Sequence, residues 1–380
     1  MNENELMSSL PVPKAVAKMA IPSVISSLVT VVYNMADTFF VGQTGDPLQV
    51  AAVSLTNPIF ILFMAFANMF GMGGSAAASM AMGEKNEKRM KQVSAFVTYA
   101  SLVVGVALAV ILMVFMTPVL NMFGANEQTF LYAKGYTFHI AYGAPFIIWS
   151  VAASFVVRAE GASKEAMIGI LSGVCVTGLP TAVFSMLMSV STIVLNQILV
   201  AYGNAPVAAI GIVFKANMFI TFLQMGLANG VQPLLGYNYG SGDHKRFVSV
   251  ERYTKKCCVI VGILATALFF VLREPIIRLF ISDGEVVYYG VKMLIAYMLS
   301  GPVIGLLFVN MNCMQSVGNS FPATILSVMR QGLLLIPLLY LLNACMGLNG
   351  VIYGQALTDY AAVILSAVLW RRIRRRIERR

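Results

Sequence analysis

The sequence contains few charged residues for its length. Only 11% of its 380 residues are Asp, Glu, Lys or Arg, whereas 58% are hydrophobic. In a soluble globular domain about a quarter of the residues carry a charge. This shortage excludes an ordinary soluble protein and favours a chain that lies in a lipid bilayer.

The residue types that carry metal, thiol and nucleotide chemistry are also scarce or badly placed. The chain has two histidines and five cysteines, and the cysteines lack the spacing of zinc or redox motifs. The stretch GMGGSAAAS at residues 71–79 lacks the Lys-Ser or Lys-Thr that ends a phosphate-binding P-loop. The sequence therefore predicts no metal, no cofactor and no enzyme activity.

Apolar segments fill most of the chain and are separated by Gly, Pro, Asn and charge clusters. About 20 apolar residues suffice for a spanning helix. The breaks predict ten helices, at residues 14–42, 50–82, 92–118, 131–157, 180–200, 207–236, 257–281, 286–313, 322–344 and 350–370.

Basic residues occur in alternate connections and in the tail RRIRRRIERR at residues 371–380, whereas the opposite connections contain no Lys or Arg. This bias predicts a multi-pass protein of the plasma membrane with both termini in the cytoplasm. The tail is then a membrane-side anchor, and not a nucleic-acid-binding arm. We expect membrane lipids as partners, no nucleic acid, and a monomer.

A pattern of glycine followed by Lys-Arg occurs twice, 157 residues apart. Gly83, Lys88 and Arg89 match Gly240, Lys245 and Arg246, and in the same register Pro145 matches Pro302. The two copies are separated by an even number of spans, so they enter the membrane in the same direction and form parallel repeats. We expect each glycine to form the turn after the second helix of its half and the basic pair to anchor that turn.

The two copies differ in length. Residues 166–178 form a segment of 13 residues, about 20 Å as a helix, which cannot cross a core of about 30 Å. We therefore divide the chain into a first bundle of four helices (1–165), a stub of a missing hairpin (166–179), a second bundle of six helices (180–370) and the basic tail. The predicted fold is an all-α integral membrane protein of about ten helices in two parallel-repeat bundles.

Four stretches resemble the multidrug and toxic compound extrusion (MATE) transporters of bacteria. They read YNMADTFFVG at 33–42, RAEGASKEAMIG at 158–169, GVQPLLGYNYGSGDHKR at 230–246 and GNSFPATILSVMRQGLLLIPLLYLL at 318–342. The resemblance implies twelve spans, as six plus six, and export of organic cations in exchange for H⁺ or Na⁺. This chain departs from that pattern where the family has its fifth and sixth helices.

Asp37 is an acid inside the first predicted helix, where a charge costs about 2.5–3.5 kcal/mol near the bilayer centre. It matches the first-helix acid of the family, so the resemblance implies an ion-coupling role. Tyr33 and Asn34 precede Asp37 by four and three residues and share its helix face. The alternative is a permanent ion pair between Asp37 and a lysine such as Lys215.

Other polar residues lie inside predicted helices of the second half. We expect Arg330 and Asp359 to form a stabilising pair between neighbouring helices. Gln224, Asn196 and Asn310 are candidates for contact with substrate in a cavity, and hydrogen bonding between helices explains them equally well.

The sequence thus favours a secondary antiporter that exports organic cations. One alternative is a shortened relative that folds without transporting, because the missing hairpin leaves interior faces uncovered. Another is a flippase for lipid-linked sugars, although Lys215 and Arg330 are the main basic residues available for an anionic headgroup.

Overall fold

The computed structural model describes residues 7–43, 47–122, 127–156, 187–188, 190–281 and 283–377. Within these ranges the chain is helical and contains no strand. The predicted stub at 166–179 and the start of the helix predicted at Pro180 lie outside the described residues. The all-α class predicted from composition is confirmed.

The first half consists of long helices joined by short turns. Its helices are α2 (Val12–Gln43), α3 (Pro47–Gly83), α4 (Glu87–Val114), the short α5 (Met116–Met122) and α6 (Glu127–Val156).

The second half begins with a short apolar helix, Val190–Val200. It continues through α8 (Asn204–Gly240), α9 (His244–Val271), α10 (Arg273–Arg278), α11 (Gly284–Met298), α12 (Gly301–Ser316), α13 (Phe321–Val328), the π-helix η1 (Met329–Leu334), α14 (Leu335–Met346) and α15 (Leu348–Ile377).

Six stretches of the described residues are long and apolar enough to cross a membrane, and the bent pair α11 and α12 makes a seventh. The 32 residues of α2 and the 30 of α6 also exceed the length that a bilayer requires. With the segment Val190–Val200, these elements occupy the ten places expected from the sequence.

Several helices extend further at the basic end than the sequence predicted. The helix predicted to start at residue 257 begins at His244, and the last helix continues to Ile377. Apolarity marks only the part of a helix inside the hydrocarbon, whereas caps mark its end. The Asn86 and Asp243 side chains accept the backbone N–H groups of Arg89 and Arg246, so both repeats start their third helix in water with the same cap.

The expected role of the repeated glycine in the turn is wrong. Gly83 and Gly240 are the last residues of α3 and α8, and neither has a positive φ angle. The left-handed residues of the two turns are Lys85 (φ 55°) and Gly242 (φ 77°), again 157 positions apart. The repeated glycines must therefore serve another purpose.

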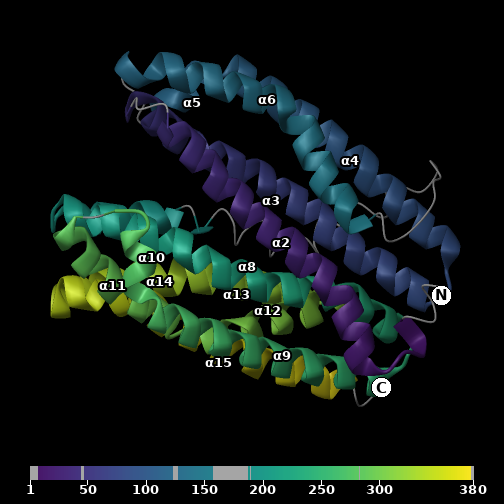
Figure 1. The fold of residues 1–380 in the computed structure, drawn as a ribbon. Coiled ribbons are helices and arrows are strands. Elements are labelled where there is room, and N and C mark those ends of the chain that lie inside the picture. The colour runs from purple at the N-terminus through teal and green to yellow at the C-terminus, as the bar shows by residue number, and fades with distance from the viewer. Residues whose placement is uncertain are drawn as a thin grey trace.

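The two halves form two groups of helices that lie together at the end carrying the described termini and diverge toward the opposite end (Figure 1). In the first group α3, α4 and α6 pack on one another, and in the second α8, α9, α11, α12 and α15 do so. The first helix, α2, makes most of its helix contacts with α8 of the second group. Helices α3 and α8 meet near their C-terminal ends, so the two repeats run in the same direction.

The repeat is also visible in the packing inside each group. A Cβ atom on Gly105 of α4 would lie 2.6 Å from the Cα atom of Pro145 in α6, and one on Gly262 of α9 would lie 3.0 Å from the Cα atom of Pro302 in α12. These pairs are related by the same shift of 157 residues. Each group thus uses one glycine to bring its third helix against the proline of its fourth.

Candidate transport site

The predicted coupling residues lie on the C-terminal half of α2. Tyr33, Asn34 and Asp37 are part of this helix, whereas their side chains lie outside the described residues. The backbone therefore places the Asp37 position on the helix that joins the two groups. The coupling role of Asp37 and the cavity role of its two neighbours stay predictions.

Arg330 and Asp359 are brought together in the interior of the second group. Arg330 Nε lies 2.7 Å from Asp359 Oδ1, and both side chains are buried. The Gln355 amide donates to the same carboxylate oxygen at 2.9 Å, and the Arg330 guanidinium lies 5.9 Å from the centre of the Phe308 ring. A buried charge pair with added hydrogen bonds fixes the relative position of η1 and α15.

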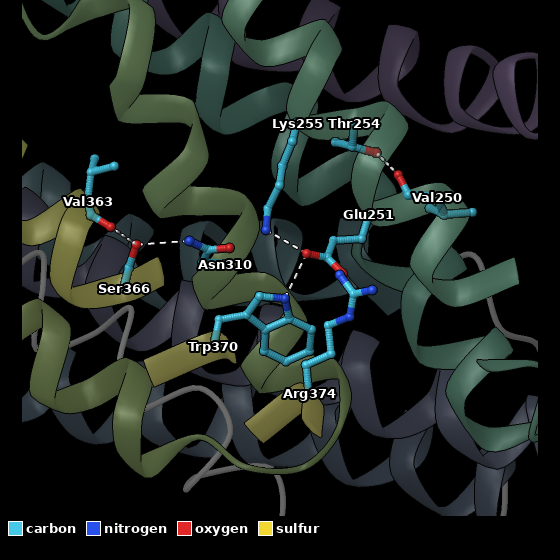
Figure 2. A network of polar contacts seen from close by, with 9 residues as sticks. All are labelled: Val250, Glu251, Thr254, Lys255, Asn310, Val363, Ser366, Trp370 and Arg374. Atoms are coloured by element: carbon cyan, nitrogen blue, oxygen red, sulfur yellow. Dashed lines mark hydrogen bonds and ion pairs between the residues drawn. The ribbon is translucent and has the colours of Figure 1, made fainter. Parts of the chain in front are cut away.

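The second buried acid of the second half, Glu251, belongs to a cluster that was not predicted from the sequence (Figure 2). Its Oε1 atom accepts the indole N–H of Trp370 at 2.7 Å and lies 2.5 Å from the Lys255 amine. Its Oε2 atom lies 3.5 Å from Nη1 of Arg374. The carboxylate is thus held by one residue of its own helix and two of α15.

The sequence did contain a signal for this cluster. Glu251 and Lys255 have the i, i+4 spacing of a helical ion pair. Because residues 245–256 are rich in charge, the sequence predicts them to lie in a connection, where helical spacing does not apply. Trp370, 2% exposed, is among the largest fully buried side chains.

Gln224 closes a break between α11 and α12, which are bent by 47°. Its amide donates to the carbonyl oxygen of Gly301 at 2.5 Å, and its side chain is fully buried. A Cβ atom on Gly305 would lie less than 3.0 Å from the Gln224 amide, so this glycine makes room for it. The structure thus gives Gln224 the helix-to-helix hydrogen bond that was the alternative to cavity contact.

The remaining candidates are dispersed along the second half. The Asn310 amide, 2% exposed, donates to the Ser366 hydroxyl at 2.9 Å. Asn196 lies half-buried on the short helix Val190–Val200. The Lys215 amine lies 6.0 Å from the centre of the Phe280 ring. The structure does not gather these residues into one site.

Both buried acids described in the second half are therefore neutralised by cations. Asp359 faces Arg330, and Glu251 faces Lys255 and Arg374. A carboxylate held in this way keeps its charge balanced without an exchangeable ion. Among the described residues no group of three His, Cys, Asp or Glu side chains could hold a metal ion.

The comparison with known proteins gives relatives along almost the whole chain. The chain is 27% identical to the multidrug export protein MepA of Staphylococcus haemolyticus (strain JCSC1435), covering 96% of this chain and 94% of the relative. It is 25% identical to MepA of Staphylococcus aureus (strain NCTC 8325 / PS 47), covering 94% and 93%.

The alignment with the first relative is longer than the chain itself. It spans 428 positions, whereas 96% of 380 residues is about 365 residues. About 60 aligned positions of that relative therefore have no counterpart in this chain.

Solved structures share the fold at low sequence identity. An outward-facing multidrug resistance MATE family transporter of the MOP superfamily matches with a TM-score of 0.93 at 18% identity, covering 100% of this chain and 99% of the other. A MOP superfamily transporter from Pyrococcus furiosus gives the same TM-score, identity and coverage.

The family model MatE matches twice, at residues 22–184 and 180–341. The two matches begin at Pro22 and Pro180, near the start of each half, and together they cover most of the sequence. The duplication inferred from the sequence is thus confirmed, and the chain belongs to the bacterial MATE family, whose members are membrane transporters rather than enzymes.

Proposed function

We propose that the protein is a secondary antiporter that exports organic cations across the plasma membrane in exchange for H⁺ or Na⁺. The observation that carries this proposal is the likeness, along 96% of the chain, to proteins named for multidrug export. The fold supports it, because two parallel repeats that join at one end and diverge at the other suit rocking about a central site. Among the described residues, the basic turns after α3 and α8 and the C-terminal end of α15 lie at the joined end (Figure 1), which favours a cytoplasmic location for that end.

Exchange at one carboxyl group is the mechanism we propose. A deprotonated Asp37 attracts a cationic substrate or Na⁺, and protonation of Asp37 removes that attraction and releases the substrate. Competition of two cations for one acid couples their opposite movements without nucleotide hydrolysis. The helix that carries Asp37 contacts both groups, so a change in its charge can alter how the groups pack.

The second half contributes structure to this mechanism. Its described acids, Glu251 and Asp359, already face basic side chains. An acid that alternates between a proton and a substrate needs a charge that is not permanently paired. We therefore assign ion exchange to the first half and structural support to the second.

A shortened, transport-inactive protein is the second candidate. The 60 or so aligned positions that this chain lacks are about the length of two spanning helices with their turns, which supports the missing hairpin inferred from the sequence. A first group without that hairpin exposes interior polar faces to lipid, which opposes stable closure around a substrate.

Export of a fluorescent organic cation from cells, under an imposed proton or sodium gradient, tests both candidates. We expect the natural chain to export the dye and the Asp37→Asn chain to lose at least about tenfold in initial rate, because the amide cannot exchange a proton. Glu285→Gln is the matched control, since Glu285 is exposed in the first turn of α11. Equal export by the natural chain and Asp37→Asn would exclude Asp37, and no export by the natural chain would favour the inactive candidate.

A further inference from the structure

Helices α3 and α8 are the second helices of the two repeats, and they approach each other at their C-terminal ends. A Cβ atom added to Gly83 would lie less than 3.0 Å from the carbonyl oxygen of Tyr237. A Cβ atom added to Gly240 would lie less than 3.0 Å from the carbonyl oxygen of Met80. Real Cβ atoms do not come so close, so each crossing point requires glycine.

This contact is reciprocal. Gly83 and Gly240 are equivalent positions in the repeat, and so are Met80 and Tyr237, because each pair is 157 residues apart. Gly83 faces the carbonyl of Tyr237, and Gly240 faces the carbonyl of Met80, so each contact is the repeat equivalent of the other. A Cβ atom on Gly236 would lie 3.1 Å from the Cβ atom of Ser79. Ser79 and Gly236 are themselves equivalent positions, 157 residues apart. An approximate two-fold axis thus passes through the crossing.

The crossing differs from the glycine–proline contacts in what it joins. It shares this property with Gly226 and Gly230 of α8, where an added Cβ atom would lie 2.9 Å from the Cα atom of Val24 and 2.8 Å from that of Ala20 in α2. Gly105 with Pro145, and Gly262 with Pro302, lie within one group and can stay unchanged when the groups move. Gly83 and Gly240 join backbone of the first group to backbone of the second. A motion that separates the groups at this end must break both contacts at once.

Arg246 adds a second tie between the halves at the same end. Its Nε and Nη2 atoms donate to the carbonyl oxygens of Met7 and Leu10, at 2.9 Å and 2.6 Å. Met7 is 3% exposed and packs in the apolar cluster that joins the N-terminal segment and α2 to the second group. Arg89, the equivalent residue of the first half, is about half exposed and pairs only locally with Glu84. The arginines of the two basic pairs therefore have different roles: Arg246 binds the N-terminal segment, whereas Arg89 forms an exposed local ion pair.

We propose that the reciprocal crossing of α3 and α8, secured by Arg246, is the gate that closes the joined end of the transporter. Glycine at positions 83 and 240 lets two backbones seal this end without side chains between them. Opening toward this end requires the crossing to part and the Arg246 contacts to release. This inference rests on the proposed transport function for its purpose, and on the contacts above for its geometry.

The test uses a cysteine at Ser75, which is 4% exposed and lies one turn before Ser79 on α3. In a chain without other cysteines, a hydrophilic maleimide is applied to membrane vesicles with the basic loops facing outward, and the rate of labelling is measured. We expect Gly83→Ala and Gly240→Ala each to raise this rate at least about tenfold, because the methyl group cannot be accommodated in the crossing.

The matched control is Gly211→Ala, which makes the same change in α8 at a place where an added Cβ atom meets nothing within 4 Å. It should label at the natural rate. Arg246→Gln and Arg89→Gln form a second matched pair, and only the former should raise labelling. They keep the test decisive if a glycine variant fails to fold.

Equal labelling of the Gly240→Ala and Gly211→Ala chains, or of the two arginine variants, would overturn the gate. Labelling needs no substrate, so the result stands apart from the export assay. Faster labelling of the glycine variants without export by the natural chain would support the gate and contradict the proposed function. Export by the natural chain with unchanged labelling of the variants would support the proposed function and contradict the gate.

Discussion

At the scale of single residues, the second half of the protein holds its buried acids in mixed clusters of cations and hydrogen-bond donors. Glu251 is the clearest case, since Lys255, Arg374 and the Trp370 indole share one carboxylate. The cluster ties the start of α9 to the end of α15 at the joined end of the molecule. Loss of this carboxylate should cost stability, because Lys255 and Arg374 would then lie without their shared anion.

We predict that Glu251→Gln lowers the free energy of unfolding by about 2 kcal/mol. Removing one partner of a buried pair costs about 3–5 kcal/mol, and the quarter exposure of the two cations reduces that cost. Thermal unfolding in detergent measures the loss. Glu274→Gln is the control, because it removes an exposed i, i+4 pair with Arg278 and should cost at most about 0.5 kcal/mol. Equal losses in both variants would contradict the prediction.

The residue scale also shows what the sequence could and could not provide. Arg330 and Asp359 were expected to pair, because a rise of about 1.5 Å per residue places both well inside neighbouring helices. Glu251 was missed because its surroundings are charged in sequence yet buried in space by Trp370, which lies 119 residues away. A long-range contact of this kind has no periodic signal in either segment.

At the scale of the helix, the break between α11 and α12 shows how irregular backbone is tolerated inside a bundle. Pro302 has no N–H, so the carbonyl of Met298 loses its usual donor. The hydroxyls of Thr266 and Tyr360 donate to the carbonyls of Met298 and Leu299, while Gln224 serves Gly301. Two other helices, α9 and α15, thus satisfy the carbonyls that the bend releases, and α8 adds a second donor to the first carbonyl of α12.

We predict that Gln224→Met lowers the free energy of unfolding by about 1 kcal/mol, since the side chain keeps its volume while the buried hydrogen bond to the Gly301 carbonyl is lost. Thermal unfolding again gives the measurement, with the exposed Gln197→Met as the control. If Gln224→Met leaves stability unchanged and alters which cations are exported, Gln224 contacts substrate instead.

Element ends were the least predictable part of the helices. Nearly every long helix among the described residues was predicted from the sequence, because the apolar runs are long and the breaks between them are distinct. It did not place the kink after Met298, since Pro145 occupies the matching position of α6 and leaves that helix continuous. The same residue type therefore bends one copy and not the other, according to the packing around it.

At the scale of the whole molecule, the two repeats share one direction, and this fixes which connections lie on the same side. The turn after α3 and the turn after α8 meet at the crossing, whereas the turn between α14 and α15 lies at the far end. Cys345 is exposed beside that far turn.

We predict that a membrane-impermeant maleimide labels Cys345 in intact cells when the other cysteines are removed. Lys88→Cys and Lys245→Cys, each in a chain without other cysteines, should react only after the membrane is permeabilised, because both lie at the basic end. Labelling of these two variants from opposite sides would contradict the parallel arrangement.

The packing of α2 determines the order in which the protein can be assembled. This helix is made well before α8, yet α8 is its main partner, and the segment before it is held by Arg246. At about 5–20 residues per second, the ribosome needs roughly 10–50 seconds to make the intervening chain. Helix α2 must therefore wait in the bilayer without its main partner, so a segment that is made early docks late.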